Sequence, residues 1–279
     1  MKQTDILLIN LLMDLLANAE NSGTCGPNLR WLLTDNGVLI ISGKGEMNDY
    51  SFDNRSPRSK SDIKRIIIGD GVTTIGSSAF DNCSNLTSVA IPNSVTEIGF
   101  RAFEDCRALT SINIPNSVTE IGDYAFYNCS ELTSVTIPNS VTRIGDLAFS
   151  GCRSLKNFTF GSGLRSIGQG AFSDCFNITQ ISSEAVVPPI CDSGAFYGIN
   201  KYKCKLIVPK NRLHSYQWAY QWGDFLLIEG STTLGITKTA YNNSGLADVY
   251  TIDGTKRLSK ASTDVINALP KGMYIMVKR

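Results

Sequence analysis

Cysteine is the residue type in this chain with the most chemistry to offer, because its thiolate can form disulfides, bind metals or act as a nucleophile. The 279-residue sequence holds eight cysteines but only one histidine, His214. A single histidine excludes metal sites built from several His ligands, and the absence of any Cys-x-x-Cys pair argues against zinc. Five of the cysteines recur every 23 residues, at Cys83, Cys106, Cys129, Cys152 and Cys175.

A small apolar side chain that recurs at a fixed period is first of all a packing residue. Thiols stacked in register point in one direction rather than toward one another, which does not suit a disulfide. We therefore predict buried free thiols at the five repeat positions. Cys191 and Cys204 lie outside the repeat and could pair with each other near the C-terminal end.

Other groups that could support catalysis are sparse. Glu104-Asp105 and Asp123 are carboxylates on solvated turns, which are more often solubilising than catalytic. The Gly-x-Gly run at 42–45 lacks the strand-to-helix context of a phosphate-binding loop. A formal net charge of +1 argues against a nucleic-acid or polybasic membrane binder. The sequence predicts a protein that is not an enzyme and has no metal or cofactor.

The elements that position the cysteines are repeated units. The same period of 23 residues separates five phenylalanines, each inside an Ala-Phe-x-x-Cys-x-x-Leu or closely similar run, at Phe80, Phe103, Phe126, Phe149 and Phe172. A fixed period of this length indicates a solenoid, in which each unit buries its apolar side against its neighbours.

One repeat can be read in detail. Val89 and Ile91 alternate with polar or small residues, which predicts a strand that ends at Pro92. Gly99 permits a tight corner, and 102–106 suits a single helical or 3₁₀ turn with one buried side. Stacked repeats should form one continuous parallel sheet with strands about 4.8 Å apart.

The run IPNSVTEIGFRAFEDCRALTS at 91–111 resembles the leucine-rich repeats of BspA-like bacterial surface proteins of the Bacteroidetes type. The resemblance implies a leucine-rich-repeat solenoid that is secreted or held at the cell surface or outer membrane. It also implies a non-catalytic role in adhesion to a protein or glycan, in the extracellular matrix or on other cells. The alternative is a structural or scaffold module of the cell envelope without a dedicated ligand.

The N-terminal part should precede and cap the repeats. Residues 1–19 are a possible signal peptide, and the alternative is an amphipathic helix over the open end of the solenoid. Residues 20–62 should form an N-terminal cap with a β-hairpin around Asp35-Asn36-Gly37. Its Ser-Gly-Thr-Cys-Gly start also resembles BspA-like proteins. The leucine-rich repeats should cover 63–184.

The C-terminal part should close the array and add a small module. Residues 185–229 read as an irregular last repeat and cap, in which a helix places Leu213, Trp218 and Trp222 over the last strand. A linker should follow at 230–240. Residues 241–279 read as a small β module that resembles the type IX secretion sorting domain; the alternative is a module packed on the end of the solenoid.

Two surfaces are candidate binding sites. The first is the outward face of the strands, whose small polar residues form columns: Ser88, Ser111, Ser134 and Asn157, beside Ala90, Asn113, Thr136 and Thr159. Solenoids use such faces for large partners, although ordinary strand hydroxyls explain this composition equally well. The second is the helical edge, where large variable residues occur on adjacent repeats: Phe100, Tyr124, Tyr127 and Leu147. They would suit a protein or glycan, or they are half-buried packing.

Overall fold

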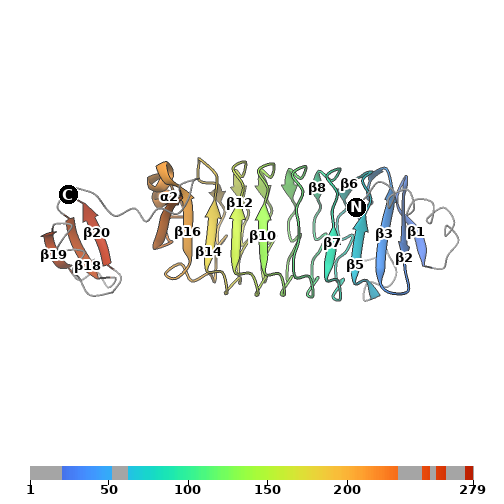
Figure 1. The fold of residues 1–279 in the computed structure, drawn as a ribbon, viewed down its shortest axis with the longest axis horizontal. Helices are drawn as coiled ribbons and strands as arrows, with labels where there is room; N and C mark the ends of the chain where they lie inside the picture. Colours follow the sequence, from blue (N-terminus) through green and yellow to red (C-terminus); the bar gives the residue numbers. More distant parts are fainter. Residues whose placement is uncertain (1–20, 52–61, 232–246, 252–255, 262–273, 279) are drawn as a thin grey trace. The chain divides into compact units, whose positions relative to one another are not determined.

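The computed structural model describes residues 21–51, 62–231, 247–251, 256–261 and 274–278 (Figure 1). The chain divides into two compact units, 1–233 and 234–279. The predicted signal segment at 1–19 and most of the predicted linker lie outside the described residues.

The first unit is a parallel β-solenoid, so the predicted fold class is confirmed. Its main sheet has two five-stranded groups. The first contains β1 (Ser22–Gly26), β2 (Leu29–Leu33), β3 (Val38–Gly43), β5 (Arg65–Ile68) and β7 (Ser88–Ala90). The second contains β10 (Ser134–Ile137), β12 (Asn157–Phe160), β14 (Gln180–Ser183), β16 (Lys205–Pro209) and β17 (Leu227–Ser231).

The main sheet is not fully continuous, which differs from the sequence expectation. Between the two groups, the repeat that contains Ile112 contributes only an isolated bridge from Ser111 to Ser134. Ile112 and Ile114 are nevertheless buried, so the core continues through this repeat.

A second sheet runs along another side of the solenoid. It has seven short parallel strands in the order β15-β13-β11-β9-β8-β6-β4, and the apolar residue of most strands points inward. These strands are β4 (Gly45–Glu46), β6 (Val72–Ile75), β8 (Glu97–Ile98), β9 (Glu120–Ile121), β11 (Arg143–Ile144), β13 (Ser166–Ile167) and β15 (Ile190–Cys191).

The third side consists of turns rather than the predicted helical or 3₁₀ turn. Arg101 and Asp105 both have positive φ, 54° and 56°, as do the equivalent residues of other repeats. The N–H groups at alternate positions of this turn, those of Arg101, Phe103 and Asp105, point to the next repeat: Phe103 N donates to Ala125 O at 2.8 Å, and Asp105 N donates to Tyr127 O at 2.8 Å. The third side is therefore also bonded from repeat to repeat.

The phenylalanines form a column through the core. Their ring centroids are 5.0–5.3 Å apart from Phe80 to Phe172, and Phe196 continues the column at 6.0 Å. All of these rings are almost completely buried. Aromatic pairs contribute about 0.5–1.5 kcal/mol each beyond the burial of their area, so the column links every repeat to its neighbours.

The repeat cysteines are buried free thiols, as predicted. Four of them, Cys106, Cys129, Cys152 and Cys175, each donate to the carbonyl oxygen of the phenylalanine in the preceding repeat, at Sγ–O distances from 3.1 to 3.3 Å. The alternative pairing of Cys191 with Cys204 is wrong, because both are free and each faces a backbone carbonyl of its own segment, Pro189 O and Lys205 O.

We expect all eight thiols to be free but unreactive in the folded chain. Burial raises the pKa of the Cys25, Cys191 and Cys204 thiols to about 12, and it raises that of Cys106 well above the ordinary value of 9.0. Titration with Ellman's reagent at pH 8 should count eight thiols in denaturant, with reaction in the native protein slower by roughly a hundredfold. Fewer than five thiols in denaturant would contradict the packing role.

The same shifts predict how stability depends on pH. The folded-state pKa values lie above the unfolded ones, so the contribution of the protonated thiols is complete below about pH 9. It should be lost as the pH rises from 9 toward 12, because the unfolded chain then releases protons that the folded chain keeps.

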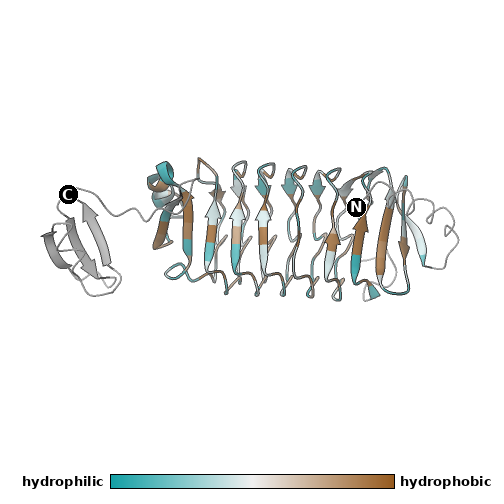
Figure 2. Ribbon diagram, in the orientation of Figure 1, coloured by the Kyte–Doolittle hydropathy of each residue, from teal (hydrophilic) through white to brown (hydrophobic). Residues whose placement is uncertain are grey.

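The N-terminal cap is the predicted hairpin. β2 and β3 pair antiparallel around the turn, where Gly37 has φ 83°, and β3 then pairs in parallel with β5. Figure 2 shows that β3 and β5 are apolar over most of their length, whereas β12 and β14 also carry hydrophilic residues. One strand of the hairpin, β3, therefore serves as the parallel neighbour of the first repeat strand, β5, so that the first repeat does not expose an open sheet edge.

The C-terminal cap contains the 3₁₀ turn η2 (Lys210–Arg212) and α2 (Leu213–Trp218), followed by β17. The predicted covering role is right for Trp222, which is fully buried, but wrong for Trp218, which is 80% exposed. Tyr216 fills the place expected of Trp218, because α2 turns that side toward the last repeat: Tyr216 Oη donates to Ala185 O at 2.9 Å.

The second unit contains β18 (Ala247–Thr251), β19 (Lys256–Ala261) and β20 (Tyr274–Lys278), which form an antiparallel sheet in the order β19-β18-β20. Within the described residues of the whole chain, no helix is long and apolar enough to cross a membrane.

Candidate binding surface

The main-sheet face carries the predicted polar columns. Ser134 lies beside Asn157, and Thr136 lies beside Thr159, in exact parallel register. Ser111, Asn113, Ser134, Thr136 and Asn157 are exposed, whereas Ser88 and Thr159 are half-buried. The structure therefore brings these residues together as a stretch of hydroxyl and amide groups, with Arg65 beside Ser88 at one end and Lys205 beside Gln180 at the other. The stretch itself contains none of the Tyr, Trp or Arg side chains that usually dominate binding energy at interfaces.

The turn side carries an aromatic cluster, which we define as Phe100, Arg101, Tyr124 and Tyr127. The rings of Phe100 and Tyr124 meet edge to face at 5.8 Å, and those of Tyr124 and Tyr127 are 5.7 Å apart. Phe100 is 43% exposed, and both tyrosines are half-buried. Three of the four predicted edge residues thus form one continuous group.

Arg101 joins this cluster, although sequence reasoning did not select it. Its guanidinium carbon lies 4.9 Å from the Phe100 ring centroid and 5.1 Å from that of Tyr124. Its Nε lies 3.4 Å from Glu104 Oε2 without forming a hydrogen bond. Cation–π contact with two rings orients the guanidinium. The sequence signal was available, because Arg101 and Tyr124 occupy equivalent positions of adjacent repeats.

Two other groups shape the environment of the cluster. Burial raises the pKa of Glu104; Arg101 opposes this effect and Asp105 adds to it. Leu147 occupies the position of Tyr124 in the next repeat, with φ 53°, and its side chain lies against Gly170. Leu147 therefore continues the row of positions that Arg101 and Tyr124 occupy, but its aliphatic side chain adds no ring to the cluster.

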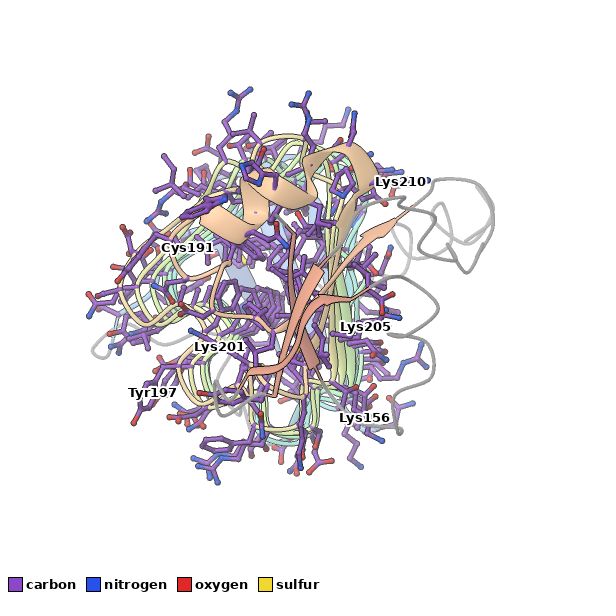
Figure 3. All side chains as sticks on the ribbon, turned by 90° about the vertical axis from the view of Figure 1, so that its left-hand side faces the viewer. Lys156, Cys191, Tyr197, Lys201, Lys205 and Lys210 are labelled. Carbon is purple, nitrogen blue, oxygen red and sulfur yellow. The ribbon has the colours of Figure 1, made fainter. Side chains whose placement is uncertain are left out.

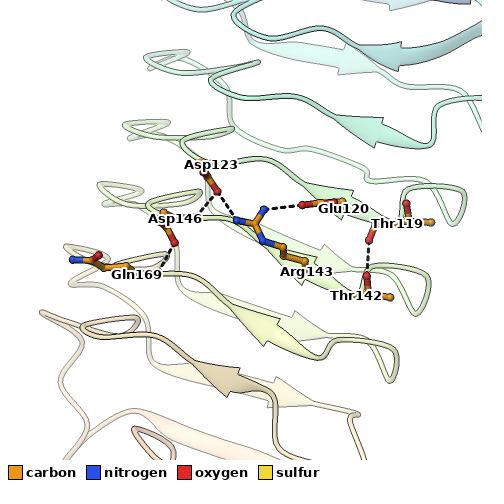
Figure 4. Close-up of polar contacts among 7 residues, drawn as sticks. All are labelled: Thr119, Glu120, Asp123, Thr142, Arg143, Asp146 and Gln169. Carbon is orange, nitrogen blue, oxygen red and sulfur yellow. Dashed lines mark hydrogen bonds and ion pairs between the residues drawn. The ribbon is translucent and has the colours of Figure 1, made fainter.

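A polar network lies beside the cluster, where the second sheet meets the turns (Figure 4). The Arg143 guanidinium donates to Glu120 at 2.7 Å and to Asp123 at 2.9 Å. Burial alone would lower the pKa of Arg143, but these two carboxylates raise it above its ordinary value. The Asp123 carboxylate also accepts from Asp146 N, so it holds the backbone of the next repeat. This arrangement makes these carboxylates structural.

The C-terminal end carries exposed apolar side chains that sequence reasoning missed. Most of the large exposed hydrophobic residues in the described part of the chain lie between 176 and 226: Phe176, Val186, Val187, Ile190, Tyr197, Tyr202, Trp218, Tyr220 and Leu226. Their signal in the sequence is the departure from the repeat pattern after Ile181. Seen from this end in Figure 3, Tyr197 and Cys191 lie on the side opposite Lys205.

The described residues offer no assembled metal site. No group of three or more His, Cys, Asp and Glu side chains that could hold a metal occurs among them. His214 is exposed on α2, 6.0 Å from Trp218 between ring centroids. The predicted non-catalytic character stays a prediction.

A solenoid with one inward Leu-, Phe- and Cys-bearing layer per 23 residues and a parallel strand at each layer is a leucine-rich-repeat protein. The model of the BspA type leucine rich repeat region matches six copies, over residues 46–179 and 119–218. These ranges together cover more than half of the sequence, so the chain belongs to the BspA-type leucine-rich-repeat family. None of the curated proteins matches the chain significantly.

Solved structures of bacterial leucine-rich-repeat proteins resemble the chain. The protein from T. pallidum is 25% identical over 57% of this chain and 81% of its own, with a TM-score of 0.45. One from Eubacterium ventriosum is 26% identical over 68% of this chain and 67% of its own, with a TM-score of 0.44. One from Bacteroides ovatus is 26% identical over 67% of this chain and 55% of its own, with a TM-score of 0.49.

Proposed function

We propose that this protein is exported and binds a macromolecular partner, a protein or glycan of the extracellular matrix or of other cells, through the aromatic cluster. The carrying observation is the Arg101 guanidinium seated against the Phe100 and Tyr124 rings. Partner binding orders side chains at a cost, and aromatic and Arg side chains that already hold each other in place lower that cost.

The backbone supports this role. Arg101 and Tyr124 are left-handed residues, and their N–H groups donate to the carbonyls of Asp123 and Asp146 in the following repeats. The cluster therefore stands on a hydrogen-bonded ladder rather than on a free loop, which keeps its side chains in a defined arrangement.

The test is retention of the full-length protein on immobilised extracellular-matrix proteins and on a glycan array. We expect the double variant Tyr124→Ala/Tyr127→Ala to lose binding by at least about tenfold, because both rings belong to the contact group. The matched control is Tyr197→Ala/Tyr202→Ala, which removes two exposed tyrosines near the C-terminal end of the solenoid, away from the cluster. Undiminished binding by the first variant would exclude the aromatic cluster.

Export is tested separately, by fractionation of the native cell. Accumulation of the chain in the cytoplasm would contradict the adhesion role. It would not contradict binding of a different partner by the aromatic cluster. The competing role, a scaffold module of the envelope, is favoured by the uncharged polar columns of the main-sheet face. If the protein has this role, we expect it to retain no partner in the binding assay and to fractionate with the envelope.

A further inference from the structure

The C-terminal end of the solenoid is closed on one side by side chains. Trp222 Nε1 donates to Pro189 O at 2.8 Å, and the Gln221 amide donates to Asp192 O and accepts from Phe196 N. Pro189, Asp192 and Phe196 belong to the last repeat, where a further repeat would otherwise supply these partners. On the second sheet and the turns, the cap therefore replaces the missing neighbour.

The main sheet ends differently, because β17 extends its ladder by one strand and the sheet stops there. β17 pairs with β16 residue by residue, from Lys205–Leu227 to Pro209–Ser231. The strands β12, β14 and β16 each have a parallel neighbour on both sides, whereas β17 has a strand on one side only within the described residues. An edge of this kind presents unpaired N–H and C=O groups that suit another strand.

The side chains of β17 indicate which residue types on an added strand would complement this edge. Within the described residues, the inward column that runs through Phe158, Ile181 and Leu206 ends at Ile228, which is only half-buried. On the outward face, Glu229 lies 2.8 Å from Lys205 Nζ, and 59% of its side chain is exposed. The edge thus combines an incompletely covered apolar residue with an adjacent, accessible carboxylate.

We propose that the free edge of β17 binds an extended peptide segment of a partner protein by strand addition. The segment carries an apolar residue opposite Ile228 and a lysine or arginine opposite Glu229. Main-chain hydrogen bonds supply the affinity and the alternating side chains supply the selectivity. The apolar residue completes the burial of Ile228, and the cation faces Glu229 from the side that Lys205 leaves open. This site is independent of the aromatic cluster.

The test uses the full-length chain and the blocked peptide Thr-Val-Lys-Val-Thr as the probe, with titration by calorimetry. Two further peptides separate the contributions: one with Glu in place of Lys, and one with N-methyl groups on alternate backbone nitrogens. We expect N-methylation to weaken binding at least about tenfold, because it removes the ladder donors and leaves the side chains. Equal binding of the methylated and unmethylated peptides would overturn the proposal.

A charge exchange tests the register. Glu229→Lys should weaken binding of the Lys peptide about tenfold and strengthen that of the Glu peptide by a similar factor. Glu131→Lys, which changes an exposed carboxylate elsewhere, should alter neither. Absence of binding to the wild-type chain would overturn the proposal. A dimer of the full chain that Gly230→Pro dissociates would also overturn it, since β17 would then pair with a second copy.

Discussion

Replacing Phe126 by alanine should lower the free energy of unfolding of the repeat unit by about 3–5 kcal/mol. Phe126 lies between Phe103 at 5.3 Å and Phe149 at 5.0 Å, nearly parallel to both rings. The substitution removes one buried ring and both of its stacking contacts at once, and neighbouring repeats held by a backbone ladder cannot collapse into the space. Guanidinium chloride unfolding followed by far-ultraviolet circular dichroism measures the change.

Phe176→Ala is the matched control, because this phenylalanine is 55% exposed and lies two layers further along the solenoid. Its effect should remain within about 1 kcal/mol, as for other surface positions. A loss of less than 1 kcal/mol for Phe126→Ala itself would contradict the view that the column of rings holds the layers together.

Replacing Trp222 by alanine should cost a similar amount, about 3–5 kcal/mol, although Trp222 lies in the cap rather than in a repeat. Its indole is fully buried, contacts the rings of Phe196 and Tyr216, and donates to Pro189 O. Truncation would leave a cavity at the end of the core and would remove the indole donor from the Pro189 carbonyl, which would keep only the weak thiol donor of Cys191. Thermal unfolding of the full-length chain gives the change.

Two further variants separate these contributions. Trp222→Phe keeps most of the ring and loses the indole N–H, so it should cost about 1–3 kcal/mol. Trp218→Ala removes the same residue type from an exposed position four residues earlier and should be nearly neutral. If Trp218→Ala destabilised the protein as much as Trp222→Ala, the cap would be closed by a different face of α2.

The two large effects have one origin. Each layer contacts only its neighbours, so stability depends on how well successive layers cover one another and on what covers the last layer. Phe126 contributes to the contact between successive layers, and Trp222 covers the last layer. The residues of the aromatic cluster and the edge of β17 do neither, so the effects of their variants can be read as effects on binding rather than on folding.

The period of the phenylalanines and cysteines was sufficient to predict the architecture. An inward residue must occupy the same place in every layer, so selection for packing repeats it in the sequence. The buried thiols and the N-terminal hairpin follow from equally local signals, a recurring small residue and an Asp-Asn-Gly turn. The tyrosines of the cluster were predictable as variable positions on adjacent repeats.

The turn side was not predictable in the same way. Arg101, Tyr124 and Leu147 have no common side-chain chemistry that marks a positive φ, and in isolation each disfavours it. In the stack, the two left-handed residues of each turn lie in the ladder whose alternate N–H groups donate to the next repeat. The sequence of a single repeat therefore predicts a helical turn at 102–106, and only the contacts between stacked repeats show that this segment is not helical.

The sequence by itself determined that identical layers stack and which residues they bury, since that information recurs every 23 residues. The tertiary structure alone decided that Tyr216, rather than Trp218, joins Trp222 in closing the end, and that Arg101 meets Tyr124. Those outcomes depend on how a single helix is turned and on contacts between neighbouring layers, and neither is repeated along the chain.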